Sequence, residues 1–140
     1  MKTEKLILKE DEIEKFSEQI FNKIKNGGLI EFYGDLGTGK TTLTKSIAKL
    51  FNIPNFTVKS PTYTYIRSYE EFNFHHIDLY RLEKIDQLLY EEIVELIENP
   101  KNIVIIEWAE KLENCINIPK IQIHLKHKSK TERDIEIKHI

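Results

Sequence analysis

The stretch LIEFYGDLGTGKTTL, residues 29–43, decides the fold class. It starts as a short apolar run typical of a buried strand, passes through a loop with three glycines, and continues into an amphipathic helix. Within it, GDLGTGKT at 34–41 fits the pattern G-x-x-x-x-G-K-[ST] at every fixed position. A chance match is the alternative, but a strand before and a helix after are the context that a phosphate-binding loop (P-loop) requires.

The chemistry of a bound nucleoside triphosphate explains each fixed position of this loop. Glycines let the backbone wrap closely around phosphate oxygens, and the helix that follows adds the positive end of its dipole. Lys40 offers an ammonium to the β- and γ-phosphates, and the hydroxyl of Thr41 is placed to ligate Mg²⁺. We therefore expect ATP and Mg²⁺ as ligands. The expected nucleotide contacts in the loop are Asp35, Leu36, Gly37, Thr38, Gly39, Lys40, Thr41 and Thr42.

P-loop enzymes also need a carboxylate at the end of a neighbouring buried strand. Asp78 and Glu107 both follow apolar strand-like runs, and Glu107 follows the run with less polar alternation. We expect Glu107 on the metal side and Asp78 near the attacking water or a switch segment, with a helix cap as the alternative role for Asp78. Thr62 is a candidate γ-phosphate sensor, and its alternative is a threonine at a strand start.

The rest of the chain alternates strands with helices, which predicts an α/β domain. The run 103–106 has four β-branched residues and no polar alternation, typical of a strand covered on both faces. We expect a P-loop NTPase fold: a largely parallel central sheet flanked by helices, with antiparallel additions including a C-terminal hairpin, in one domain over 1–140. Helices are expected at 13–24, 40–51 and 85–97, strands at 6–8, 29–33, 58–67, 72–77 and 103–106, a turn at 69–71 and a hairpin within 121–140.

Composition narrows the functional classes. The chain has 140 residues with 21 basic and 23 acidic side chains, a net charge of −2, so a large basic surface for nucleic acid is not expected. The single cysteine, Cys115, has no partner for a disulfide or a metal site. No apolar run approaches membrane-spanning length, and no signal-peptide core is found in the first residues. These features predict a soluble cytoplasmic protein without membrane contact.

Three further residues invite a functional interpretation. His75 and His76 lie in a strand-like run without partners at metal-ligand spacing, so we interpret them as core or surface histidines. Trp108 follows Glu107, and we expect it to pack near the nucleotide or a partner, with ordinary core packing as the alternative.

Four segments together resemble one bacterial family. They are GDLGTGKTT (34–42), SPTYT (60–64), HIDLYRL (76–82) and IEWAEK (106–111), and their order and spacing are similar to those of the TsaE family, also called YjeE. A P-loop alone is generic, whereas HIDLYRL combined with the other segments is specific. The resemblance extends from about residue 29 to the end of the chain, with Thr38 and Ala109 standing where the family often has Ala and Pro.

The resemblance implies an ATPase for threonylcarbamoyl modification of adenosine 37 (t6A37) in tRNAs that read codons beginning with A. It implies a partner, the TsaD–TsaB transferase complex, through which tRNA is reached only indirectly. It also implies that Lys40 and Thr41 contact phosphate and metal, that Glu107 is the second metal-side residue, and that Asp78 is required. Thr62 would belong to a switch-like segment, and Arg133 would lie near the nucleotide.

Other readings of the P-loop remain open. A small-molecule kinase needs several arginines for phosphate clamping, and the chain has only Arg67, Arg81 and Arg133. A GTPase needs the guanine-reading motif N-K-x-D, and the run NKIK at 22–25 fails at its last position. A nucleotide-gated binding module with negligible catalysis is the third alternative, and measured turnover with and without the partner discriminates it from an ATPase.

Overall fold

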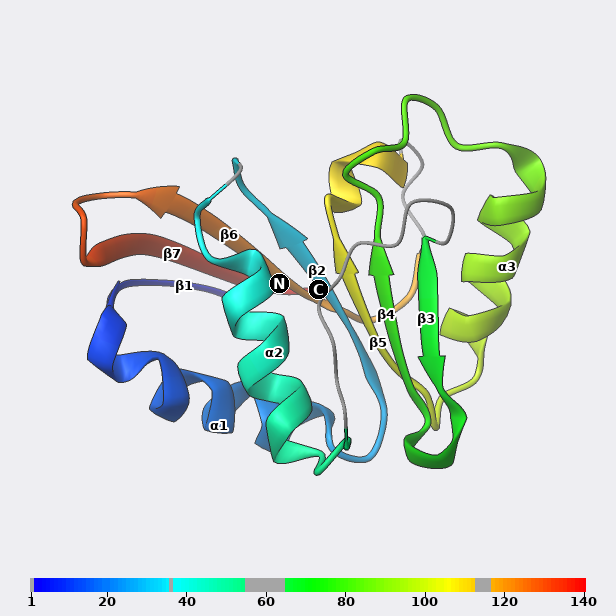
Figure 1. The fold of residues 1–140 in the computed structure, drawn as a ribbon, viewed down its shortest axis with the longest axis horizontal. Coiled ribbons are helices and arrows are strands. Elements are labelled where there is room, and N and C mark those ends of the chain that lie inside the picture. Colours follow the sequence, from blue (N-terminus) through cyan, green and yellow to red (C-terminus); the bar gives the residue numbers. More distant parts are fainter. Residues whose placement is uncertain (1, 36, 55–64, 113–116) are drawn as a thin grey trace.

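A single seven-stranded sheet organises the chain in the computed structural model, which describes residues 2–35, 37–54, 65–112 and 117–140 (Figure 1). The strand order is β1-β7-β6-β2-β5-β4-β3. The four central strands are parallel, and antiparallel pairs extend the sheet at both ends. The strands are β1 (Lys2–Lys9), β2 (Gly28–Tyr33), β3 (Ile66–Tyr69), β4 (Phe74–Asp78), β5 (Ile103–Glu107), β6 (Ile121–His127) and β7 (Glu132–His139).

The central strands direct polar residues to one edge of the sheet. Every residue of β5 is buried, which confirms the interpretation of 103–106 as a strand covered on both faces. Because β2, β4 and β5 run parallel, their carboxyl ends meet at the upper edge in Figure 1, where the P-loop, Asp78 and Glu107 follow or end these strands. In α/β sheets this edge is where ligands bind.

Helices cover the sheet on both faces but over different strands. The helices α1 (Ile13–Ile24) and α2 (Lys40–Leu50) cover one face, and α3 (Gln87–Glu98) covers the other face at the β3 end (Figure 1). Two hydrophobic cores result. Strand β2 contributes to both cores, because Ile30 and Phe32 enter the core of α1 and α2 while Leu29 enters that of α3.

The elements expected within the described residues are present, but several boundaries differ. The first strand is longer than 6–8, because all eight residues of β1 pair with β7. The turn expected at 69–71 is a 3₁₀ helix, Glu70–Phe72, and β4 therefore starts at Phe74. Helix α3 begins at Gln87 because the Asp86 carboxylate accepts the N–H of Leu89 at 2.8 Å and caps it. Most of the strand expected at 58–67 lies outside the described residues.

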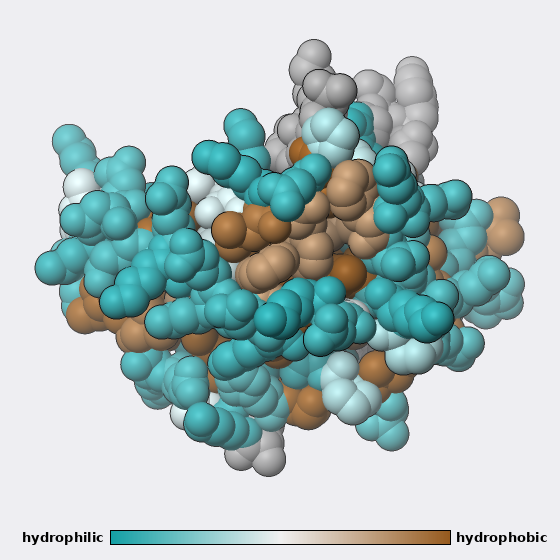
Figure 2. Space-filling view, turned by 90° about the horizontal axis from the view of Figure 1, so that it is seen from below, coloured by the Kyte–Doolittle hydropathy of each residue, from teal (hydrophilic) through white to brown (hydrophobic). Residues whose placement is uncertain are grey.

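The end of the molecule opposite the P-loop carries an apolar area ringed by hydrophilic side chains (Figure 2). Aromatic rings pack together near this end: Phe51 contacts Phe21 and Phe74, and Tyr69 contacts Phe74. Within the described ranges, no helix is long and apolar enough to cross a membrane.

Candidate functional site

The loop between β2 and α2 depends on glycine for its conformation. Gly34, Gly37 and Gly39 have φ angles of 146°, 80° and 107°, a region that side chains disfavour. A Cβ atom on Gly34 would also lie 2.6 Å from the backbone oxygen of Leu125 on β6. All three positions therefore favour glycine for their backbone conformation, and Gly34 does so also because β6 approaches it closely.

Hydrogen bonds within the loop fix its shape. Thr38 is buried, and both its backbone N–H and its hydroxyl donate to the Asp35 carbonyl, at 3.3 and 2.8 Å. The hydroxyl of Thr44 donates to the Lys40 carbonyl at 2.9 Å, inside the first turns of α2. Asp35, Gly37 and Thr42 are exposed to solvent. Leu36 lies outside the described residues.

Lys40 turns back onto the loop that precedes it. Its ammonium donates to the carbonyls of Gly34 and Asp35, the latter at 3.0 Å, and lies 3.9 Å from the centre of the Trp108 ring. Only 4% of Lys40 is exposed, and this burial lowers the pKa of its ammonium. Nearby carboxylates oppose that decrease; they belong to Glu110, Glu107, Asp35 and Asp78.

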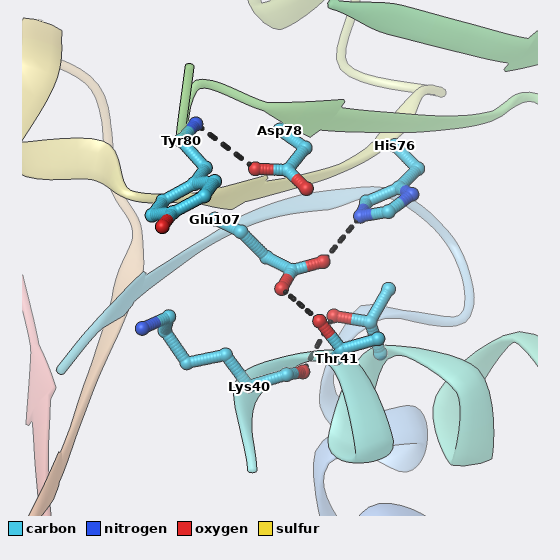
Figure 3. A network of polar contacts seen from close by, with 7 residues as sticks. Lys40, Thr41, His76, Asp78, Tyr80 and Glu107 are labelled. Atoms are coloured by element: carbon cyan, nitrogen blue, oxygen red, sulfur yellow. Dashed lines mark hydrogen bonds and ion pairs between the residues drawn. The ribbon is translucent and has the colours of Figure 1, made fainter. Parts of the chain in front are cut away.

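Glu107, at the end of β5, lies between Thr41 and His76 (Figure 3). Its Oε1 accepts the Thr41 hydroxyl at 2.8 Å, and its Oε2 contacts Nε2 of His76 at 2.5 Å. Glu107 is 1% exposed and His76 is 5% exposed. The structure thus brings the P-loop hydroxyl and the expected metal-side carboxylate into direct contact, with a buried imidazole on the other side of that carboxylate.

Asp78 lies beside Glu107, because the two residues are register partners on β4 and β5. One carboxylate oxygen of Asp78 accepts the N–H of Tyr80 at 3.0 Å. Partial burial, followed by the nearby Glu107 charge, raises the pKa of Asp78, and the Tyr80 hydrogen bond works against this. Asp78 therefore closes a short turn, while the N-cap of the following helix is Asp86.

Trp108 lies at this site with its ring partly exposed. Its φ of 61° is unusual for a bulky residue, and its ring contacts Tyr80 at 5.0 Å between centroids, besides the Lys40 ammonium. Trp108 therefore packs against the core of α3 and also contacts the P-loop lysine.

Arg133, on β7, contacts the P-loop from the hairpin side. Its Nε donates to the Thr38 carbonyl at 3.1 Å, and its Nη1 donates to the carbonyls of Ser129 and Glu132 at 2.9 Å each. A pocket of about 190 Å³ opens next to it. The pocket is lined by the loop, the first turn of α2, the end of β1 and the hairpin, including Leu8, Ile13, Gly37, Gly39, Thr42, Lys130 and Arg133.

The donor set fits a magnesium ion held partly by phosphate. Among the described residues, no group of three or more His, Cys, Asp or Glu could hold a metal alone. Mg²⁺ in nucleotide sites uses one or two protein oxygens plus phosphates and water. Four nearby carboxylates act to raise the pKa of Lys40, and an added cation would reduce their repulsion of phosphate.

His76 and Tyr80 are site residues that sequence reasoning missed, and Thr62 lies outside the described residues. His76 and Glu107 are 31 positions apart, so a search for metal-ligand spacing does not pair them. Strand alternation was the available signal. His76 precedes Asp78 by two residues on one strand, so the two side chains point to the same face. The expectation of a core or surface histidine agrees with the burial of His76, and the structure adds Glu107 as its neighbour.

Comparisons with known proteins agree on one family. The family model described as "Threonylcarbamoyl adenosine biosynthesis protein TsaE" matches residues 7–135. The chain is 33% identical over 121 residues to the tRNA threonylcarbamoyladenosine biosynthesis protein TsaE of Rickettsia conorii, covering 83% of this chain and 66% of that protein. It is 34% identical over 130 residues to the protein of the same name from Aquifex aeolicus, covering 91% and 92%.

A solved structure has a similar fold. The crystal structure of Bacillus subtilis YdiB superposes with a TM-score of 0.72 at 26% identity, covering 97% of this chain and 84% of that chain. The expected fold class, a largely parallel sheet with antiparallel strands at its ends, is confirmed.

Proposed function

Because this chain belongs to the TsaE family of threonylcarbamoyl adenosine biosynthesis proteins, we propose that it is a Mg²⁺-dependent ATPase acting in tRNA modification. The observation that carries the proposal is the contact of the P-loop Thr41 with Glu107, beside the buried Lys40. A hydroxyl on a carboxylate next to a phosphate-binding lysine is the arrangement that nucleotide hydrolysis requires of a P-loop protein.

Each residue has a proposed role in this reaction. The loop backbone from Asp35 to Thr42 binds the phosphates, and the Lys40 ammonium leaves the carbonyls of Gly34 and Asp35 to contact them. Thr41 and Glu107 hold the metal side, and Mg²⁺, when bound, neutralises charge that develops on the phosphates. Asp78 orients the attacking water. Thr62 remains our candidate for sensing the γ-phosphate.

The nucleotide base is proposed to enter the pocket beside Arg133. This pocket adjoins the P-loop at Gly37 and Gly39, and Leu8 and Ile13 give it apolar walls. The guanine-reading motif N-K-x-D is absent from the sequence. We therefore expect ATP to bind more tightly than GTP. Competition followed by Trp108 fluorescence tests this, and tighter binding of GTP would contradict it.

The ATP cycle is proposed to act on the TsaD–TsaB complex in the cytoplasm, which modifies adenosine 37 of tRNAs reading codons that begin with A. The net charge of −2 argues against binding tRNA directly and so supports a protein partner. We expect slow hydrolysis by the isolated chain and faster hydrolysis with the complex.

Two measurements test this function. The first is ATP turnover with and without TsaD–TsaB; binding of ATP without any stimulated turnover would instead favour a nucleotide-gated binding module. The second is mass spectrometry of tRNA nucleosides after depletion of the protein. Unchanged threonylcarbamoyladenosine would reject the biological role and leave ATP binding untouched.

A further inference from the structure

We propose that His76 is a positioning residue that orients the Glu107 carboxylate for the metal side of the site. The inference rests on the proposed function, since it concerns how the Thr41–Glu107 pair is held. The contact that carries it is the 2.5 Å approach of His76 Nε2 to Glu107 Oε2. It adds a residue to the site that neither the P-loop pattern nor the expected pair of carboxylates includes.

The direction of the hydrogen bonds defines what His76 does. A carboxylate oxygen accepts hydrogen bonds, and we assign Nε2 of His76 as the donor to Oε2. On the other side, Thr41 donates its hydroxyl hydrogen to Oε1. The lone pairs of the Thr41 hydroxyl are then left for a metal ion, and each oxygen of the carboxylate is held by a hydrogen bond.

Burial makes this contact hard to replace by water. Glu107 is 1% exposed and His76 is 5% exposed, and a buried carboxylate oxygen without a donor is unfavourable. Without the imidazole, Oε2 would turn toward another donor, and Oε1 would move with it away from Thr41. Hydrogen-bonding partners of metal-site residues are worth about 10–100-fold in metal affinity or activity.

The neighbouring His75 provides a matched control. It is also 5% exposed on β4, but it points to the opposite face, where its Nδ1 lies 2.7 Å from the Ser68 hydroxyl. A substitution at His75 therefore removes a similar buried imidazole from the same strand without touching Glu107. Any effect of packing alone should be alike at the two positions.

The test compares two amides of different reach. His76→Gln carries an N–H near the position of Nε2, whereas the shorter side chain of His76→Asn falls short of Oε2. Binding of Mn²⁺ to the protein–ADP complex, followed by electron paramagnetic resonance, is the main measurement. ADP binding without metal, followed by Trp108 fluorescence, checks that each nucleotide site is intact, and circular dichroism checks the fold.

We expect His76→Asn to weaken Mn²⁺ binding at least tenfold, consistent with the effect of such partners. We expect His76→Gln to recover most of that loss and His75→Asn to bind Mn²⁺ like the wild type. If His76→Asn does not fold, His76→Met, which has similar bulk and no donor, takes its place. Unchanged Mn²⁺ binding in His76→Asn, or in His76→Met where that replaces it, overturns the inference. A His76→Gln variant that binds Mn²⁺ as weakly as His76→Asn overturns it too.

Failure of the proposed function would look different. A wild-type chain that binds no nucleotide, or binds it without any metal dependence, would reject the Mg²⁺-dependent ATPase and His76 with it. A wild-type chain with normal metal-dependent binding that His76→Asn leaves unchanged rejects only the role of His76.

Discussion

Lys40 is bound to its own loop by the carbonyls of Gly34 and Asp35, and it contacts the Trp108 ring. Phosphate oxygens must stabilise the Lys40 ammonium more than these contacts do. For Lys40→Ala we predict a loss of about 1.5–3 kcal/mol in ATP-binding free energy, the usual value for a charged hydrogen bond. Isothermal calorimetry measures it, with the exposed Lys45→Ala on α2 as the control. Equal affinities for the two variants would contradict the role of Lys40.

Substitutions of Glu107 and Asp78 distinguish a carboxylate that holds the metal from one that orients the attacking water. In Glu107→Gln, the amide nitrogen must face one of two donors, Thr41 or His76, so we predict at least a tenfold loss of Mg²⁺-supported hydrolysis with weaker metal binding. For Asp78→Asn we predict slower hydrolysis with metal binding retained. Steady-state ATPase assays over a range of Mg²⁺ concentrations measure both. A Glu107→Gln enzyme of normal rate beside an inactive Asp78→Asn enzyme would show that we have reversed the roles.

Some residues of the site were predictable from sequence because their chemistry is local. Gly34, Lys40 and Thr41 belong to one loop whose spacing already encodes its geometry. Glu107 was predictable because it ends an apolar strand. His76 was not identified, since its partner is distant in the sequence and only the parallel register of β4 and β5 brings them together.

At the scale of elements, the C-terminal hairpin supports the P-loop. Strand β6 places the Leu125 carbonyl against Gly34, and Arg133 on β7 holds the Thr38 carbonyl. We predict that Arg133→Ala weakens ATP binding by about 1 kcal/mol, because one partly exposed hydrogen bond to the loop is lost. Nucleotide titration measures this, with Lys128→Ala from the same hairpin as the control. An Arg133→Ala variant that binds ATP like this control would show that the hairpin does not support the loop.

Element boundaries were predictable where a local sequence pattern determines them. The continuous apolar run of β5 identified that strand, and periodicity identified α3. The start of α3 was placed two residues early because Ile85 continues the apolar pattern, while the Asp86 cap sets the true first turn. The length of β1 follows from pairing with β7, a distant partner that the lysines and glutamates of β1 do not indicate.

At the scale of the whole molecule, the buried His75 couples stability to pH. Burial is the main cause that lowers the pKa of His75 below its ordinary value of 6.5. The unfolded chain then binds the proton more readily, so the stability from neutral His75 is present above about pH 6.5 and is lost on acidification. The raised pKa values of Asp78 and Glu110 act with the opposite sign.

Comparing the pH dependence of unfolding in the wild type and in a His75 variant isolates the contribution of His75. We predict that the wild type loses more unfolding free energy between about pH 7 and about pH 5 than His75→Gln does, because glutamine does not titrate. Urea denaturation at each pH measures the two slopes, and Asp78 and Glu110 cancel because both proteins contain them. Equal losses would mean that His75 does not contribute to the pH dependence.

Strand β2, with side chains in both cores, has a consequence for how the molecule opens. A fluctuation that frees β1 breaks pairing at one end of the sheet and disturbs one core, whereas opening β2 disturbs both. Amide hydrogens of β2 should therefore exchange with deuterium more slowly than those of β1, as mass spectrometry of the exchanged peptides can measure. The P-loop would then be free to rearrange around each nucleotide while the strand that carries it stays closed.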